Sequence, residues 1–86
     1  MIMMPQEDKQ IISLSAMSLG QVGFIVGFSL ETKDGERVQA MGLVPGEQVE
    51  VVRRASSDGS IEIKIRSYFR SLRKPEADLI KVKLLA

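Results

Sequence analysis

The sequence predicts a mainly β protein with short helices, built as one small antiparallel barrel. Short segments along the chain alternate apolar and polar side chains, which is the period of half-buried strands. The dipeptide Asp58-Gly59 separates two of these segments and is typical of a β-hairpin. Near the end of the chain, Pro75 opens a segment long enough for about a single helical turn. The 86 residues suffice for one domain with one core.

The first part of the chain combines a tail with a short strand. Residues 1–10 are polar after the methionines, and we expect a disordered tail there, with the domain covering residues 11–86. Residues 11–18 carry apolar side chains at intervals of two and then three positions. This pattern predicts a short strand that leads into a helical turn and ends at Gly20.

Residues 21–30 are predicted to form the first long strand. Four apolar side chains share one face of it: Val22, Phe24, Val26 and Phe28. Gly23 and Gly27 lie on the other face, where the missing side chains leave room for a close backbone approach or a β-bulge.

A short helix and a tight turn are predicted next. Residues 35–41 form the helix, with Asp34 as its N-cap. Gly42 stands where the helix end needs a left-handed residue. Pro45 and Gly46 then supply the two central positions of a type II turn.

The second half contains the clearest strands. Residues 48–54 and 60–66 are predicted strands, and the loop at residues 55–59 joins them as a hairpin. The inward positions of the second strand are all isoleucine: Ile61, Ile63 and Ile65.

The last three elements are a strand, a helical turn and a closing strand. We expect a strand over residues 68–72 and a helical turn over residues 74–80. Residues 81–85 close the sheet with Val82 and Leu84 pointing inward. Together the elements fit a small SH3-like barrel, whose closure would remove exposed strand edges. A five-stranded oligonucleotide-binding barrel is the competing geometry, and the helical turn before the last strand favours the SH3-like one.

The composition excludes several classes of site. The chain contains no Cys and no His, so it lacks the side chains that bind zinc and transition metals. Its serines therefore have no histidine to act as a general base, and no Walker-type phosphate loop or dinucleotide fingerprint is present. We expect no metal site, no cofactor and no enzymatic activity.

Charge is unevenly distributed along the chain. Residues 1–48 carry a formal charge of −3 and residues 49–86 a charge of +4. A basic half can bind nucleic acid, although alternating Lys and Arg also simply solvate the outer face of a sheet. Few aromatic side chains are available for base stacking, so nucleic acid is the less favoured partner. The longest apolar run, residues 23–28, is too short to cross a bilayer, so we expect a soluble cytoplasmic protein without membrane insertion.

Three sequence runs, taken in order, resemble the FeoA family. They are residues 14–26, with LSAM and GFIV; residues 37–52, RVQAMGLVPGEQVEVV; and residues 61–82, with IEIKIR, SLRK and IKV. The resemblance implies an SH3-like domain that serves bacterial ferrous-iron uptake as a small cytoplasmic accessory or regulatory protein. It also implies a partner, the FeoB-type membrane iron transporter, which has a cytoplasmic GTPase domain.

The chain departs from the family pattern around its fifth strand. Ser67 stands where the family usually has Gly, and Arg70 stands at a usually apolar position. If Tyr68 and Leu72 face inward, strict alternation would bury Arg70 and expose Phe69. Either a bulge shifts the register or Phe69 belongs to an exposed apolar contact site.

Two groups of residues are candidates for partner binding. Leu43 and Val44 are apolar in a loop that should lie at the surface, with a plug at the barrel end as the alternative role. Phe69, Arg70 and Arg73 combine an aromatic ring with arginines, which is common chemistry at interface anchors. Self-association of the chain into a homo-oligomer through an exposed barrel edge is a further alternative.

Overall fold

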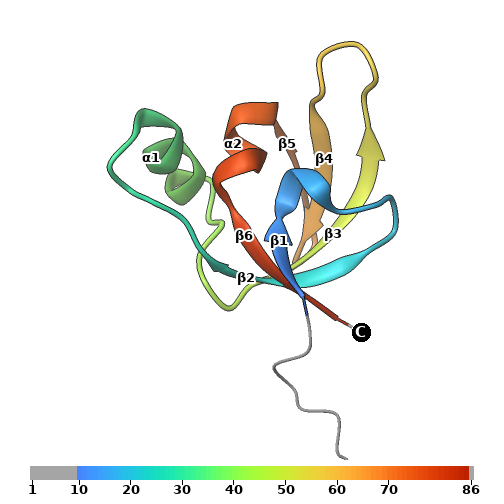
Figure 1. Cartoon of the computed structure of the whole chain (residues 1–86), viewed down its shortest axis with the longest axis horizontal. Helices are drawn as coiled ribbons and strands as arrows, with labels where there is room; N and C mark the ends of the chain where they lie inside the picture. Colours follow the sequence, from blue (N-terminus) through green and yellow to red (C-terminus); the bar gives the residue numbers. More distant parts are fainter. Residues whose placement is uncertain (1–9, 86) are drawn as a thin grey trace, which may run out of the picture.

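The computed structural model describes residues 10–85 as a six-stranded antiparallel sheet with two short α-helices and one 3₁₀ turn (Figure 1). The elements in chain order are β1 (Ile11–Ser13), η2 (Leu14–Ala16), β2 (Val22–Gly27), α1 (Lys33–Ala40), β3 (Gln48–Arg54), β4 (Ile61–Ile65), β5 (Tyr68–Leu72), α2 (Lys74–Leu79) and β6 (Lys81–Leu84). The expected tail lies outside the described residues except for Gln10, whose carbonyl accepts a hydrogen bond from the Leu84 N–H at 2.9 Å.

The strand order across the sheet is β1-β6-β2-β3-β4-β5. Neighbouring strands are antiparallel, as predicted. The predicted closure is wrong, because β1 and β5 stand at the two ends of this order and each pairs with one neighbour among the described strands. Figure 1 shows α2 between α1 and the η2 turn, on the open side of the curved sheet. The described sheet therefore keeps two free edges.

The core lies between the concave face of the sheet and the two helices. Its strand contribution includes the three isoleucines of β4, all buried as predicted. The buried apolar side chains are Leu14, Met17, Ile25, Val38, Leu43, Val49, Val51, Ile61, Ile63, Ile65, Leu72, Ala77, Ile80 and Val82. They come from strands, helices and loops, so the domain has one continuous core.

Strand β2 presents its apolar stripe to the outside. Ile25 is buried, whereas Phe24 and Val26 are exposed on the outer face. A Cβ at Gly23 would lie 2.9 Å from the carbonyl oxygen of Lys83 in β6, which confirms the predicted close approach. The register against β6 also shifts just before Gly27, as the predicted bulge requires.

Helix α1 begins two residues earlier than predicted. Its N-cap is Thr32, whose hydroxyl accepts the Gly35 N–H at 3.0 Å, so the assignment of Asp34 as the N-cap is wrong. The helix ends as predicted, with Gly42 at φ +86°, and Gly46 has φ +93° in the following turn. The positive φ angles of these two glycines allow the connection between α1 and β3 to turn tightly.

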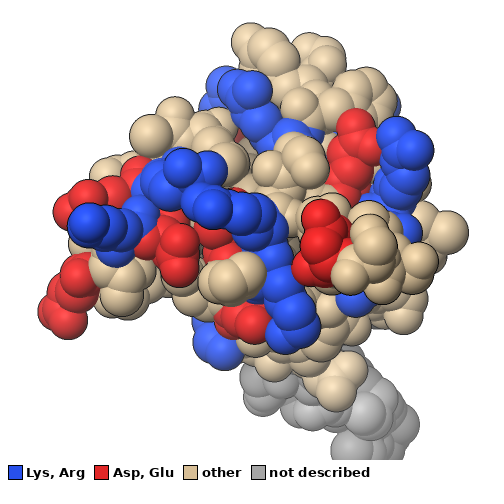
Figure 2. All heavy atoms as spheres, turned by 90° about the horizontal axis from the view of Figure 1, so that it is seen from above, with Lys and Arg blue, Asp and Glu red and all other residues tan. Residues whose placement is uncertain are grey.

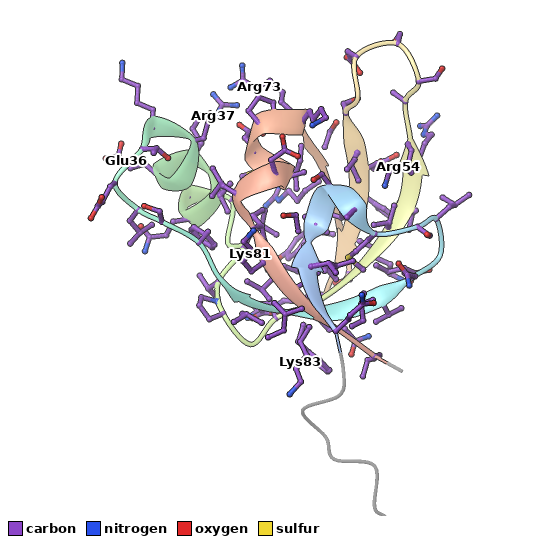
Figure 3. All side chains as sticks on the ribbon, viewed as in Figure 1. Glu36, Arg37, Arg54, Arg73, Lys81 and Lys83 are labelled. Carbon is purple, nitrogen blue, oxygen red and sulfur yellow. The ribbon has the colours of Figure 1, made fainter. Side chains whose placement is uncertain are left out.

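The buried carboxylate of Glu76 connects the two helices. Its side chain is 1% exposed, and it is the one buried charged residue in the described part of the chain. One oxygen accepts the backbone N–H of Arg73 at 2.9 Å and so caps α2. The other accepts Nε–H of Arg37 in α1 at 2.8 Å and lies 3.4 Å from the guanidinium of Arg73. Figure 3 shows the two arginines next to each other between the helices.

The surroundings of Glu76 favour its charged form. Burial opposes ionisation, but the hydrogen bonds from Arg73 and Arg37 and the positive charges of both side chains outweigh it. The pKa of Glu76 is therefore lowered from its ordinary value of 4.5. At neutral pH a full negative charge faces two positive ones.

We expect Glu76→Gln to lower the free energy of unfolding by about 1–3 kcal/mol, because hydrogen bonds to a charged acceptor are weakened and two arginines lose their counter-charge. Urea denaturation measures the change. Asp78→Asn is the matched control, since it removes an exposed ion pair with Lys74 in the same helix and should cost less. Equal losses in the two variants would contradict the special role of Glu76.

The stability of the wild type should also depend on pH through Glu76. Its native pKa is below the unfolded value, so its contribution is present above about pH 4.5 and is lost as the pH falls through the native value. The unfolding free energy of Glu76→Gln should therefore fall less steeply in acid than that of the wild type. Parallel curves for the two proteins would rule this contribution out.

Candidate protein-binding groove

A surface hollow separates the end of α1 from strand β5. Its volume is about 420 Å³, and we call it the β5 groove. It is lined by Ala40, Met41, Gly42, Val44, Ile65, Arg66, Tyr68 and Arg70. One wall comes from the end of α1 and the loop after it, and the other comes from the β4–β5 hairpin. The groove thus depends on how α1 is held against the rest of the domain.

A smaller apolar hollow lies on the other side of Val44. It has a volume of about 110 Å³, and we call it the Val44 pocket. It is lined by Gly27, Phe28, Leu30, Gln39, Val44 and Pro45. Val44 is half-buried and belongs to both hollows, so the groove and the pocket meet at this side chain.

Strand β5 places an aromatic ring on each side of the sheet. Tyr68 is 56% exposed and Phe69 is 57% exposed. The register between β4 and β5 is regular, so the alternative with a bulge is wrong and Phe69 points to the outer face. It lies opposite Lys64 of β4 on that face.

Arg70 shares the face of Tyr68 and Leu72 without being buried. Leu72 faces the core and is fully buried, whereas Tyr68 and Arg70 border the open β5 groove. The Arg70 guanidinium carbon lies 5.4 Å from the centre of the Tyr68 ring, within the range of a cation–π contact. Strict alternation is therefore compatible with an arginine at this position, because the groove is open to solvent there.

The β4–β5 turn is fixed by Arg66. Its φ is +58°, a left-handed conformation that is uncommon for a residue with a side chain. Its guanidinium donates two hydrogen bonds to the carboxylate of Glu47, one of them from Nε at 3.0 Å. These bonds and the paired charge lower the pKa of Glu47 and raise that of Arg66. The pair links the hairpin to the loop that precedes β3, on the border of the groove.

The β5 region is strongly basic. Residues 63–75 contain five Lys or Arg and no Asp or Glu. Arg66 pairs with Glu47 and Arg73 with Glu76, whereas Arg70 has no ion-pair partner among the described residues. Seen from above, over the helices, Lys and Arg side chains form a band with carboxylates beside it (Figure 2). Of the two charged side chains that line the groove, Arg66 is paired with Glu47, so Arg70 supplies a positive charge that no described acidic side chain pairs.

The structure brings together only part of the predicted binding residues. Leu43 is fully buried in the core, so its side chain is not available at the surface and its alternative role as a plug fits its position. Val44 and Arg70 both line the β5 groove. Phe69 lies on the opposite face of β5, and Arg73 is bound to Glu76 at the start of α2.

Sequence reasoning missed the contribution of Tyr68 and Met41 to the groove. Tyr68 entered the sequence argument only as a residue that could face inward with Leu72, and its exposure follows from the open space beside α1. The signal that could have identified it is a lone tyrosine next to a basic strand position. Within residues 10–85, no group of three or more acidic, Cys or His side chains is arranged to hold a metal ion. None of the helices in that range is long and apolar enough to cross a membrane.

Comparison with known proteins gives a consistent result. The family model described as the FeoA domain matches residues 12–84. No curated protein sequence matches the chain. Among solved structures, a FeoA-like protein from Clostridium acetobutylicum is 29% identical with a TM-score of 0.82, and the match covers 88% of each chain.

Two further structures extend the comparison. Iron(II) transport protein A from Clostridium thermocellum is 35% identical with a TM-score of 0.78, covering 86% of this chain and 46% of that one. A zinc complex of FeoA from Stenotrophomonas maltophilia, described as a prokaryotic SH3 domain protein, is 21% identical with a TM-score of 0.71, covering 84% and 89%. The last of these confirms the predicted SH3-like fold over the oligonucleotide-binding alternative.

The strained turn at Arg66 gives a stability test. Arg66→Ala and Arg66→Gly both remove the ion pair with Glu47, but only Gly adopts a positive φ without strain. We expect the Tm of Arg66→Ala to be roughly 4–8 °C below that of Arg66→Gly, measured by circular dichroism. A Tm of the alanine variant equal to or above that of the glycine variant would show that the left-handed conformation carries no cost here.

Proposed function

This chain belongs to the FeoA family, as its sequence predicted, and we propose that it binds the cytoplasmic part of the FeoB-type membrane GTPase that transports ferrous iron. The family is associated with ferrous-iron transport, in which its members are accessory proteins. The chain would then act as a small regulatory protein at the cytoplasmic side of the transporter. The β5 groove is the proposed contact surface.

The observation that carries this proposal is the combination of a groove, the exposed ring of Tyr68 and a free strand edge in one place, with the exposed ring of Phe69 on the other face of the same strand. Exposed apolar side chains beside arginine are common anchors of protein interfaces. Here Tyr68 and Arg70 border a hollow that continues past Val44 into a small apolar pocket. A hollow of this kind accepts one or two side chains of another protein, with charge around its rim.

The other partner classes are supported less well by the same surface. Tyr68 and Phe69 point to opposite faces of β5, so they do not form a shared platform on which consecutive bases could stack. Each copy of β5 carries Arg70 and no acidic side chain, so pairing of two copies through β5 would add a repulsive contact and no attractive ion pair within the two strands. An acidic segment of the transporter would need no stacking platform and would not be repelled by the basic side chains near β5.

Co-purification with the ferrous-iron transporter of the same organism tests the proposal. The wild type should be retained, and Tyr68→Ser and Phe69→Ser should each reduce retention by at least about tenfold if these rings are interface anchors. Leu19→Ser is the matched control, because Leu19 is an exposed apolar side chain, at 65%, in the turn before β2. Each variant is first checked for folding by its amide NMR spectrum.

Failure of the wild type to be retained in any nucleotide state of the transporter would overturn the proposed function. If Leu19→Ser is not retained while both β5 variants are retained, the proposed function stands, but the contact surface lies away from β5.

A further inference from the structure

We propose that the occupant of the β5 groove is an extended acidic segment of the partner protein, which adds to the free edge of β5 as a further strand. The identity of the partner rests on the proposed function. The mode of binding rests on the strand itself and on the charges around it. The segment would carry acidic side chains and at least one apolar side chain facing the groove.

The backbone of β5 is available for strand addition. Its one neighbour among the described strands is β4, and in an antiparallel pair alternate residues direct their N–H and C=O groups away from the neighbour. The strand is five residues long, has a regular register and contains no proline. The opposite edge of the sheet, β1, is three residues long and offers fewer such groups. Backbone pairing of this kind supplies affinity in several peptide-binding domains.

The charges select an acidic segment. Five Lys or Arg and no Asp or Glu lie between residues 63 and 75, and this stretch contains the whole of β5. Arg70 projects on the groove side of β5, next to the edge where a strand would be added, and Lys64, opposite Phe69, projects on the outer side of the neighbouring strand β4. Neither cation has an ion-pair partner among the described residues. The same charges disfavour a second copy of this chain as the occupant, because like charges would face each other across the new strand pair.

The groove adds a requirement for an apolar side chain. Alternate side chains of an added strand point to opposite sides, so one set would enter the groove between Tyr68 and Val44. Met41, the C-cap of α1, lines the groove on the helix side, and the Val44 pocket shares Val44 with the groove. A segment that alternates apolar and acidic residues satisfies the backbone, the charges and the groove together.

The test uses a synthetic peptide of about twelve residues that alternates Val and Glu, with a Lys-for-Glu peptide as its charge control. Amide NMR spectra of the folded protein should shift at β5 and Val44 with the acidic peptide, and amide hydrogen exchange in β5 should slow. Two N-methylated peptides complete this arm, one methylated at the odd-numbered residues and one at the even-numbered residues. Methylation of one set should abolish binding and methylation of the other should leave it unchanged, because only one set of N–H groups faces β5.

Charge-reversed variants of the protein provide the second arm. Arg70→Glu should weaken binding of the acidic peptide by about tenfold or more, whereas Lys33→Glu makes the same change in net charge at the start of α1 and should weaken it by less than about threefold. Equal effects of the two variants, or insensitivity to N-methylation of both sets of residues, would overturn the proposal. So would tighter binding of an oligothymidylate of matched charge to the same amides.

This result is separable from the proposed function. Co-purification of the transporter together with failure of the peptide would show that a folded surface is recognised and would overturn only the extended segment. Peptide binding at β5 without co-purification would support the mode of binding and remove the transporter as its source.

Discussion

The arrangement of the two helices depends on the ionised carboxylate of Glu76. Helices of six and eight residues are too short to persist without tertiary contacts. Each of them buries an apolar side chain in the core, Val38 in α1 and Ala77 in α2, and Glu76 links the two helices directly. The carboxylate caps α2 through Arg73 and binds Arg37 of α1. Because the end of α1 forms one wall of the β5 groove, the position of that wall depends on the contact made by Arg37, one helical turn earlier. The side chains of Arg37 and Arg73, labelled in Figure 3, are 55% and 62% exposed, so both arginines remain in contact with water while the carboxylate is buried.

Local patterns were sufficient to predict the strands and most of the turns. Strand β3 was predicted with its observed bounds, and the isoleucines of β4 identify the core face because alternation is a property of the strand itself. The start of α1 could not be predicted in the same way, since Thr32 and Asp34 are both good N-caps. The structure decides between them through the hydrogen bond from the Gly35 N–H to the Thr32 hydroxyl. Position 35 also excludes a side chain, because a Cβ there would lie 1.8 Å from the carbonyl oxygen of Ser29.

The candidate site was less predictable, because it is formed by segments that are distant in the sequence. Val44 and Arg70 were identified separately, and only the folded chain shows that they line one hollow. Leu43 could not be assigned from the sequence, since a loop leucine can face either water or the core. The contact between Glu76 and Arg37 joins residues that are 39 positions apart, so no local sequence pattern predicts it. Closure of the sheet was predicted from a general tendency of small β domains, whereas here α2 covers the open side and two edges remain.

Four carboxyl groups have lowered pKa values, and the chain contains no His and no Cys. We therefore expect the charge of its side chains to change little near neutral pH. The pKa values of Glu47, Asp58, Glu76 and Asp78 are all shifted downward, away from the neutral range. The basic side chains of the chain are all Lys and Arg. Since His is the side chain that ordinarily changes its charge between pH 5 and 8, and the chain has none, the electrostatic potential around β5 should change little across that range. Ionic strength, which screens these fixed charges, is the solution variable to which such a surface responds.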